Sequence, residues 1–290
     1  HLGYGRVIDK TIKPARSQEP VSQDPFNCYV LDDDTVWTEF YHTRDGYLLR
    51  FPGLADFDVT IDGSQVVAYP AKGTDEATIE HLYINQLVPL ALSRQGQPAF
   101  HASVVTLGGS AIAFLGHSGT GKSTLAASFA LNGEMFLTDD ALLVEESDEG
   151  CRVRPSHASL RLWSDSVEAI VGNDIQKAGP ISYSDKAQLL AGEALAFCNE
   201  SQPLAGAYVL EQRSVSSVLI RELTGLDRYM AWLGNSFLLD VVDNDLLARH
   251  FDWTHRISGN VPTFALDFPR DYDILPEVRA AIREHAGALA

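Results

Sequence analysis

The sequence contains few basic residues for its length, and this shortage limits what the protein can bind. Of its 290 residues, 22 are lysine or arginine and 39 are aspartate or glutamate, which gives a formal net charge of −17 at pH 7. A surface with that balance repels phosphate backbones and anionic membranes, so we expect neither nucleic acid nor a membrane as a partner. A phosphate-bearing ligand would have to be held by a local group of cations.

Cysteine and long apolar runs are also scarce. The three cysteines, Cys28, Cys151 and Cys198, lack the close spacing of metal ligands, and an odd number cannot form a complete set of disulfides. Reduced thiols are typical of the cytosol, which predicts a cytoplasmic protein. No apolar run approaches the ~20 residues that a bilayer-spanning helix needs. The 45% of apolar residues is ordinary for a globular protein.

The most specific motif is the stretch GHSGTGKST at residues 116–124, which satisfies G-x-x-x-x-G-K-[ST] at every fixed position. An apolar run of strand length precedes it, and a run of helical character follows it. A strand, a glycine-rich turn and a helix N-terminus leave backbone N–H groups pointing the same way, which makes a cradle for phosphate. Lys122 would reach the terminal phosphates of ATP, and the Ser123 hydroxyl would ligate Mg²⁺. The expected nucleotide-binding residues are Gly116, Ser118, Gly119, Thr120, Gly121, Lys122, Ser123 and Thr124.

An acidic pair follows the next expected strand, residues 134–138. In an open α/β sheet, ligands bind at the carboxyl ends of the strands, so Asp139 and Asp140 are expected to face the phosphates and their metal. One carboxylate can hold Mg²⁺, and the other can take a proton from an incoming hydroxyl. His101 lies in a run that a Gly-Gly turn joins to the strand before the phosphate loop. The two runs should pair in one sheet, with His101 among them.

The sequence predicts three segments. Residues 1–30 are polar and contain three prolines, which predicts a poorly ordered lead-in. Residues 31–97 predict a small α+β N-terminal domain, with a role in packing, oligomerisation or substrate docking. Its antiparallel strands are expected at 36–41, 47–51, 57–61 and 65–69, before a helix that starts near Thr74. Residues 98–290 would form the catalytic domain. The C-terminal third of the chain is expected to complete the sheet, with strands at 206–211, 217–223 and 261–268 and helices at 227–241, 244–257 and 277–285.

The order of these motifs is similar to that of a known family. His101-Ala-Ser, the phosphate loop and Leu137-Thr-Asp-Asp140 resemble the catalytic domain of HPr kinase/phosphorylase and its relatives, among them the serine kinases of lasso-peptide precursors. The resemblance implies an α/β fold with a P-loop kinase core of the HPr kinase/phosphoenolpyruvate carboxykinase-like type. It also implies that Asp140 is the catalytic base, Asp139 a metal contact and His101 a residue near the transferred phosphate.

A second segment extends the resemblance. Residues 154–163, RPSHASLRLW, look like the P-x-x-P-x-L-R-L-W segment of these relatives, with Ala158 where a proline is usual. Arg161 is therefore the first candidate for a cationic contact to the transferring phosphoryl group, and Lys186 is the second. The acidic E-x-R-G segment and the second, basic signature of HPr kinase/phosphorylase are both missing. We therefore expect an acceptor other than HPr.

The main hypothesis is an ATP- and Mg²⁺-dependent kinase that transfers the γ-phosphoryl group to a serine hydroxyl of a peptide or small protein, such as a ribosomally made precursor peptide. Two alternatives remain open. Shikimate- and gluconate-type kinases also place an acid after the next strand, so a small-molecule hydroxyl kinase fits the motifs, although those chains usually begin near the phosphate loop. The second alternative is a nucleotide-gated binding or regulatory protein that does not turn over its nucleotide.

Overall fold

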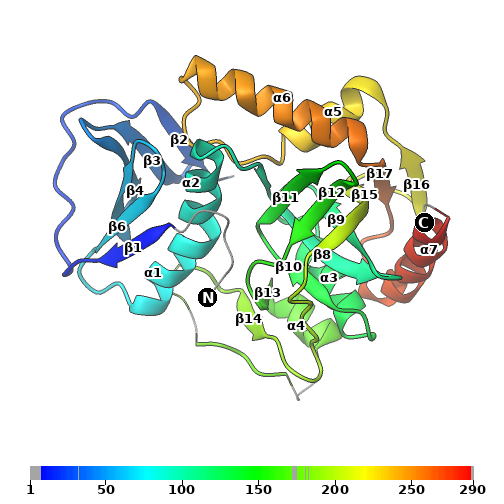
Figure 1. The fold of residues 1–290 in the computed structure, drawn as a ribbon. Helices are drawn as coiled ribbons and strands as arrows, with labels where there is room; N and C mark the ends of the chain where they lie inside the picture. The colour runs from blue at the N-terminus through cyan, green and yellow to red at the C-terminus, as the bar shows by residue number, and fades with distance from the viewer. Residues whose placement is uncertain (1–7, 32, 172–174, 180, 182, 289–290) are drawn as a thin grey trace. The chain divides into compact units, whose positions relative to one another are not determined.

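The computed structural model describes residues 8–31, 33–171, 175–179, 181 and 183–288, and the chain divides into two compact units (Figure 1). The first unit is formed by residues 1–97, 181–184 and 238–250. The second is formed by residues 98–180, 185–237 and 251–290. Helix α6 (Asn244–Asn260) begins in the first unit and ends in the second.

A six-stranded sheet forms the first unit, in the order β1-β6-β5-β4-β3-β2. Neighbouring strands are antiparallel except β1 and β6, which are parallel. The strands are β1 (Asp9–Ile12), β2 (Asn27–Val30), β3 (Val36–His42), β4 (Gly46–Phe51), β5 (Ala55–Thr60) and β6 (Gln65–Pro70). The antiparallel run β3 to β6 is the meander that the alternating apolar pattern predicts, and its inward side chains, such as Phe40, Leu49 and Phe57, are fully buried.

Residues 8–30 differ from the poorly ordered lead-in that their composition predicts. They contribute β1 and β2, one at each edge of the sheet. The prolines at 14, 20 and 25 fall between these two strands, where a missing N–H removes no ladder bond. Between the strands, the Gln18 amide donates to the Asp56 carboxylate over 2.8 Å, which attaches the segment to β5. Residues 1–7 of the expected lead-in lie outside the described residues.

Helical turns follow the sheet. They are α1 (Glu76–Leu82), the π-helical segment η1 (Tyr83–Leu87) and α2 (Val88–Arg94). The Asp75 carboxylate caps α1 by accepting from the Thr78 N–H over 2.7 Å. Pro89 stands at the start of α2, where its missing N–H is tolerated, and this is how the helical spacing continues past a proline.

The second unit has an α/β fold built on a nine-stranded sheet. The path runs β10-β8-β9-β15-β12-β11-β7, while β17 also pairs with β15, and β16 pairs with β17. The strands β9, β15 and β17 are parallel, so their carboxyl ends lie at one edge. The strands are β7 (Ala99–Phe100), β8 (Ala102–Leu107), β9 (Ser110–Leu115), β10 (Phe136–Thr138), β11 (Leu142–Ser147), β12 (Gly150–Arg154), β15 (Gln202–Leu210), β16 (Leu219–Glu222) and β17 (Thr263–Asp267).

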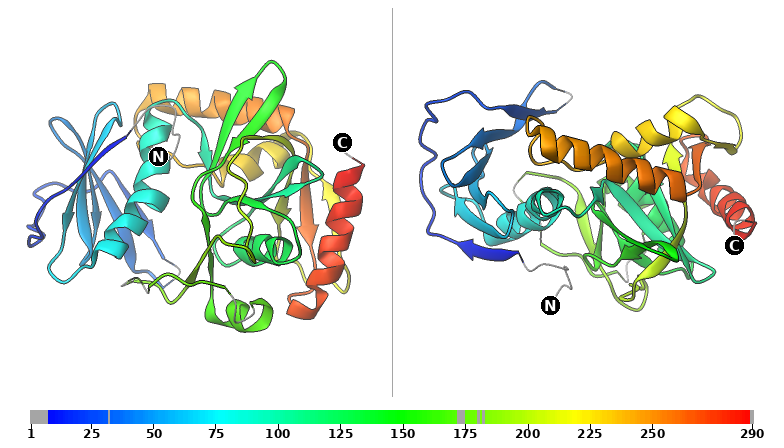
Figure 2. Two further views of the ribbon diagram at one scale, coloured as in Figure 1. Left: turned by 60° about the horizontal axis from the view of Figure 1, so that its bottom comes forward. Right: turned by 45° about the horizontal axis from the view of Figure 1, so that its top comes forward.

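Helices cover both faces of this sheet (Figure 2). One face packs on α3 (Lys122–Ala130) and α7 (Leu275–Gly287), through Phe114 of β9 and Phe129 of α3. The other face packs on α5 (Gly225–Leu233) and the second half of α6, where Trp232 is fully buried. Alternate residues of β9 enter the two cores, as the two-residue period of a strand requires. A two-stranded antiparallel sheet of β13 (Ser159–Leu162) and β14 (Ala187–Leu190), the helix α4 (Ser164–Ile170) and the short helix η2 (Tyr272–Ile274) complete the unit.

Helix α5 is shorter than the helix expected at 227–241. It ends at Leu233, and the chain then extends along β7, where the Phe237 N–H donates to the Ala99 carbonyl over 2.9 Å. This early end brings Asn235 beside the start of the glycine-rich turn. Across the described residues, no helix combines the length and the apolar character that crossing a bilayer demands.

Candidate functional site

The glycine-rich turn connects β9 to α3, and two of its glycines are required by the backbone. At Gly116 (φ +142°), an added Cβ would lie 2.8 Å from Thr120 Oγ1 and 3.0 Å from the Leu210 carbonyl oxygen. Gly121, the N-cap of α3, has φ +93°, a left-handed conformation that other residues rarely adopt. The turn therefore brings backbone N–H groups and the N-terminus of α3 to one place, which favours an anion.

Lys122 is the first residue of α3 and only 5% exposed. Its ammonium group donates to the carbonyl oxygens of Gly116 over 2.6 Å and His117 over 2.9 Å, so the lysine folds back over the turn. Burial lowers the pKa of Lys122 to about 8, because desolvation disfavours the charged form. An anion in the turn would stabilise the ammonium form and raise this pKa again.

Asp139 follows β10 and is buried beneath the turn. Its Oδ1 accepts from the hydroxyls of Ser123, over 2.9 Å, and Ser103, over 2.5 Å. Its Oδ2 accepts from the Arg161 backbone N–H over 2.9 Å. Burial first, and then the neighbouring charge of Asp140, raise the pKa of Asp139, while these hydrogen bonds oppose the rise.

The pairing of Ser123 with Asp139 fits a magnesium site. Mg²⁺ in nucleotide enzymes is usually bound by one or two protein oxygens, with substrate phosphates and water as its other ligands. Among the described residues, no three His, Cys, Asp or Glu side chains gather into a group able to hold a metal by themselves. The hydroxyl and carboxylate would therefore hold Mg²⁺ together with a phosphate ligand, as this chemistry requires.

Asp140 differs from its neighbour in both backbone and surroundings. It has φ +69°, a left-handed conformation that is costly for most residues with a Cβ and that aspartate adopts more readily than most. Its side chain lines the pocket described below. His101 Nδ1 lies 3.1 Å from the Asp140 carbonyl oxygen, and burial lowers the pKa of His101 to about 4, so the ring is neutral at pH 7. The neutral ring can donate from Nδ1 and thereby hold this backbone conformation.

The pairing of β8 with β9 places His101 close to the glycine-rich turn. Strands β8 and β9 pair antiparallel, as the Gly-Gly turn between them predicts, and Ala102 lies opposite Leu115. His101 therefore stands at the same end of the sheet as Gly116. The structure therefore brings His101, the glycine-rich turn and the acidic pair to the same end of the sheet.

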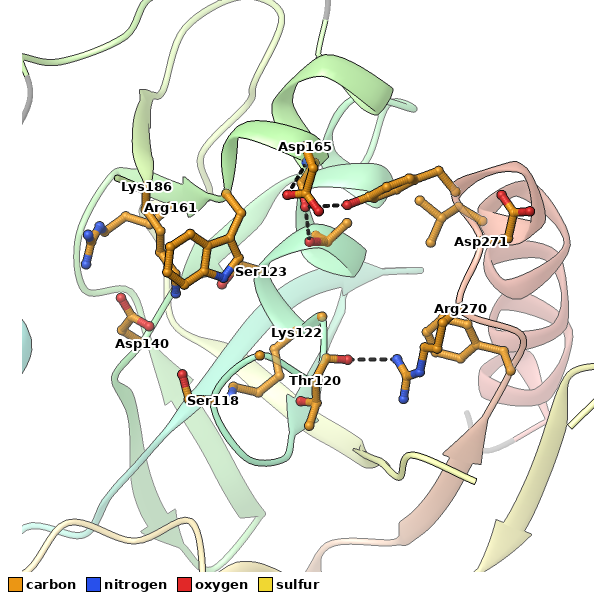
Figure 3. A pocket seen from close by; sticks show the side chains of 18 of the residues that line it. Ser118, Thr120, Lys122, Ser123, Asp140, Arg161, Asp165, Lys186, Arg270 and Asp271 are labelled. Carbon is orange, nitrogen blue, oxygen red and sulfur yellow. Dashed lines mark hydrogen bonds between the residues drawn. The ribbon is translucent and has the colours of Figure 1, made fainter. Parts of the chain in front are cut away.

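These groups surround a pocket of about 300 Å³ (Figure 3). Asp140, Arg161 and Lys186 lie on one side, Lys122 and Thr120 lie below the middle, and Arg270 and Asp271 lie on the other side. Two of the site residues predicted from the sequence, Gly116 and Asp139, are buried and do not line this pocket. The others line it, and they are His101, Ser118, Gly119, Thr120, Gly121, Lys122, Ser123, Thr124, Asp140, Arg161 and Lys186.

Arg161 and Lys186 reach the pocket from the small sheet of β13 and β14, the former within β13 and the latter just before β14. Arg161 belongs to β13, beside the strand end that carries Asp139. Lys186 precedes β14, and its ammonium lies 5.1 Å from the centre of the Trp163 ring, at the distance of a cation–π contact. In a protein of strongly negative net charge, Lys122, Arg161, Lys186 and Arg270 form the local group of cations that a phosphate ligand requires.

Several residues of the site have no motif in the sequence. Arg270 follows β17, and its Nη1 donates to the Thr120 carbonyl over 2.8 Å. The Asn235 amide oxygen accepts from the Gly116 N–H over 3.1 Å. The rule that ligands bind at the carboxyl ends of parallel strands was the available signal for Arg270, because a strand was expected just before it. No feature of the sequence predicts that Asn235 belongs to the site.

Comparisons with known proteins add little to this geometry. No protein-family model matches the sequence, and a search of curated proteins finds no match. Among solved structures, the chain is similar to the Hpr(Ser) kinase/phosphatase of Coxiella burnetii, with a TM-score of 0.34 and 12% sequence identity. That similarity covers 64% of this chain and 95% of the other. Values this low transfer neither fold nor activity, so a function has to be inferred from the pocket and the motifs.

Proposed function

We propose that this chain is an ATP-dependent kinase that transfers the γ-phosphoryl group to a serine hydroxyl of a peptide or small protein. One observation carries the proposal: Lys122, at the N-terminus of α3, and Asp140, after β10, line the same pocket. A lysine on a phosphate cradle and a carboxylate that can accept the acceptor's proton are the two groups that such a transfer needs from the protein.

The donor end of the reaction is the glycine-rich turn. The backbone N–H groups of the turn and the N-terminus of α3 bind the phosphates of ATP, and Lys122 exchanges the carbonyls of Gly116 and His117 for phosphate oxygens. Ser123 and Asp139 would hold Mg²⁺, which supplies charge neutralisation at the phosphate oxygens when bound.

The transfer itself exchanges one bond for another. The acceptor oxygen forms a bond to the γ-phosphorus, and the bond from that phosphorus to the β,γ-bridging oxygen breaks, its electron pair leaving with ADP. The acceptor's proton passes to the Asp140 carboxylate. The Arg161 guanidinium balances charge on the transferring group, and His101 orients Asp140 through its carbonyl.

The serine acceptor is inferred from the resemblance of the motifs at His101, residues 116–124 and Asp139-Asp140 to serine kinases. It is tested by incubating the purified chain with Mg²⁺ and γ-³²P-labelled ATP on arrays of serine-, threonine- and tyrosine-containing peptides, beside a panel of hydroxyl metabolites. We expect label on serine peptides. Asp140→Asn should lower the transfer rate on the order of 10²–10⁴-fold, and calorimetry should find its ATP affinity retained.

The matched control is Asp148→Asn, which makes the same change in the exposed turn between β11 and β12. It should transfer at the wild-type rate. Undiminished transfer by Asp140→Asn would remove the proposed base. Label on metabolites alone would replace the peptide acceptor, and ATP binding with no product on any acceptor would favour a regulatory protein.

A further inference from the structure

The pocket extends beyond the groups that the transfer uses. Asp140, Arg161 and Lys186 lie on one side of Lys122, and Arg270 and Asp271 lie on the opposite side (Figure 3). If the terminal phosphate faces Asp140, as the proposed function requires, the rest of the nucleotide has to run the other way. The α-phosphate, ribose and base would then reach the segment 268–275.

Arg270 is held in place by three groups at this far side. Its Nη1 donates to the Thr120 carbonyl over 2.8 Å, its Nη2 donates to the Glu211 carbonyl, and its guanidinium lies 4.5 Å from the centre of the Phe268 ring. These contacts fix the plane of the guanidinium where it lines the pocket. A fixed, planar cation is a platform on which an aromatic base can stack.

Tyr272 is fixed beside Arg270 by a chain of hydroxyl groups. Its hydroxyl lies 3.0 Å from Ser166 Oγ, which lies 3.1 Å from Thr124 Oγ1 in the first turn of α3. The half-buried ring lines the pocket, together with the buried side chains of Phe268 and Leu275. This part of the pocket adds aromatic and apolar side chains to the charged groups of Arg270, Asp271 and Asp165, whereas the side that holds Asp140 has the aromatic ring of Trp163 beside its charges.

Asp271 supplies a hydroxyl acceptor next to these rings. One of its carboxylate oxygens accepts from the Asp273 N–H over 3.0 Å, which caps the short helix η2 and fixes the side chain. Asp271 also belongs to the lining of the pocket. An acidic side chain near a nucleotide site commonly accepts hydrogen bonds from ribose hydroxyls.

We propose that Arg270, Asp271 and Tyr272 form the nucleoside end of the pocket, where a purine base stacks on the Arg270 guanidinium beside Tyr272 and the ribose hydroxyls donate to Asp271. The proposal rests on the proposed kinase function for its direction along the pocket. Purines are favoured because their larger π-face stacks more strongly than that of pyrimidines.

The test separates the nucleoside from the phosphates. Calorimetry in Mg²⁺ compares ATP with inorganic tripolyphosphate, which carries the phosphates alone. Arg270→Lys keeps the charge and removes the planar group, so ATP affinity should fall on the order of 10-fold while tripolyphosphate affinity stays within about 2-fold. Arg283→Lys, the same change on the exposed face of α7, is the matched control and should alter neither affinity.

A second variant tests the ribose contact. Wild-type protein should bind ATP more tightly than 2′-deoxy-ATP, and Asp271→Asn should reduce that preference. Equal losses for ATP and tripolyphosphate in Arg270→Lys would make Arg270 a support of the phosphate turn and overturn the proposal, as would unchanged ATP affinity. If wild-type protein binds ATP no more tightly than tripolyphosphate, the nucleoside adds no affinity, and this inference alone is overturned. Protein that binds neither ligand overturns the kinase proposal with it.

Discussion

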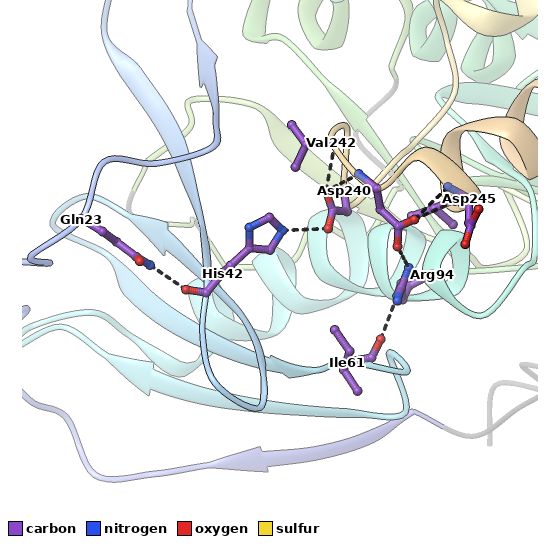
Figure 4. Close-up of polar contacts among 9 residues, drawn as sticks. Gln23, His42, Ile61, Arg94, Asp240, Val242 and Asp245 are labelled. Atoms are coloured by element: carbon purple, nitrogen blue, oxygen red, sulfur yellow. Dashed lines mark hydrogen bonds and ion pairs between the residues drawn. The ribbon is translucent and has the colours of Figure 1, made fainter.

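Charged side chains are used differently in the two units. In the first unit they bond to one another. Arg50 of β4 makes two hydrogen bonds, of 2.8 and 2.9 Å, to Asp56 on the neighbouring strand β5. Arg94 pairs with Asp243, which caps the start of α6, and His42 bonds to Asp240 over 2.8 Å (Figure 4). Each of these bonds joins two segments of the same unit.

The second unit also has surface ion pairs, such as Arg283 with Glu134, but a further set of its charges lines one pocket. Lys122, Asp140, Arg161, Lys186 and Arg270 all line it, and burial lowers the pKa of Lys122 to about 8. Removing one partner of a buried ion pair leaves the other charge uncompensated and destabilises the fold, whereas a buried cation aimed at a cavity is costly until a ligand arrives. We therefore expect pocket substitutions to lower activity with little loss of stability, and substitutions of first-unit pairs to have the opposite effect.

Among the substitutions that compare the two units, the largest effect is expected for Lys122→Met. Loss of the ammonium should lower the transfer rate on the order of 10²–10³-fold, as removal of one preorganised donor to a developing charge does. The free energy of unfolding should change by less than about 1 kcal/mol, because the relief of burying a charge offsets two lost hydrogen bonds. Lys13→Met on the exposed lead-in is the control. A large loss of stability in Lys122→Met would make this lysine a structural residue and break the comparison.

Arg50→Leu should instead lower the stability of the protein and leave its transfer activity unchanged. Its side chain and that of Asp56 are 12% and 4% exposed, so the substitution leaves a carboxylate buried without its cation. Breaking a buried pair costs about 3 kcal/mol of unfolding free energy, measured by urea denaturation. The transfer rate of the folded protein should stay at the wild-type level.

The double variant Arg50→Leu/Asp56→Leu sharpens the result. It removes both charges and should recover part of the lost stability, since the penalty arises from the unpaired carboxylate. If the double variant is no more stable than Arg50→Leu, the lost unfolding free energy comes from the packing of the arginine side chain and not from the unpaired carboxylate.

A smaller effect is expected for Ser103→Ala. The Ser103 hydroxyl is fully buried and donates to Asp139, the carboxylate assigned to magnesium. Outer hydrogen bonds of this kind change metal affinity on the order of 10-fold, so the Mg²⁺ concentration for half-maximal transfer should rise by that factor. Thr106→Val, on the same strand but bonded to the Met135 carbonyl, should leave it unchanged. An equal rise in both would indicate damage to β8.

The parts of the site that the sequence predicts are those that lie close together in the chain. The motif at residues 116–124 fixes a turn between a strand and a helix, and the short connection between β8 and β9 fixes His101 at the level of Gly116. The acidic pair follows the next strand. Few residues separate these parts, so the sequence predicts that they share one sheet, while the registers of β8 with β9 and of β10 with β8 decide that they meet at one end.

Contacts between distant segments could not be predicted in this way. Arg270 meets Thr120 only because β17 pairs with β15 and β15 pairs with β9, and a pattern of apolar residues does not specify which strands pair. Asn235 reaches Gly116 because α5 ends at Leu233, whereas the apolar pattern continues past that residue. In the lead-in, prolines suggested disorder, although they lie between two strands and leave both free to pair.

The smallest expected effect concerns pH and stability. Burial lowers the pKa of His250, which is 3% exposed on α6 in the first unit. Above the pKa of the unfolded chain, about 6.5, the His250 ring is neutral in both the folded and the unfolded state. As the pH falls below that pKa, the unfolded chain takes up a proton first, so the free energy of unfolding decreases. His250→Gln should therefore lose less stability than wild type between pH 7.5 and 5, by at most about 1.4 kcal/mol for each pH unit. His255→Gln, exposed on the same helix, is the control, and urea midpoints across this range give the measurement. If both variants follow the wild-type slope, His250 is not the buried titrating group that links the first unit's stability to pH.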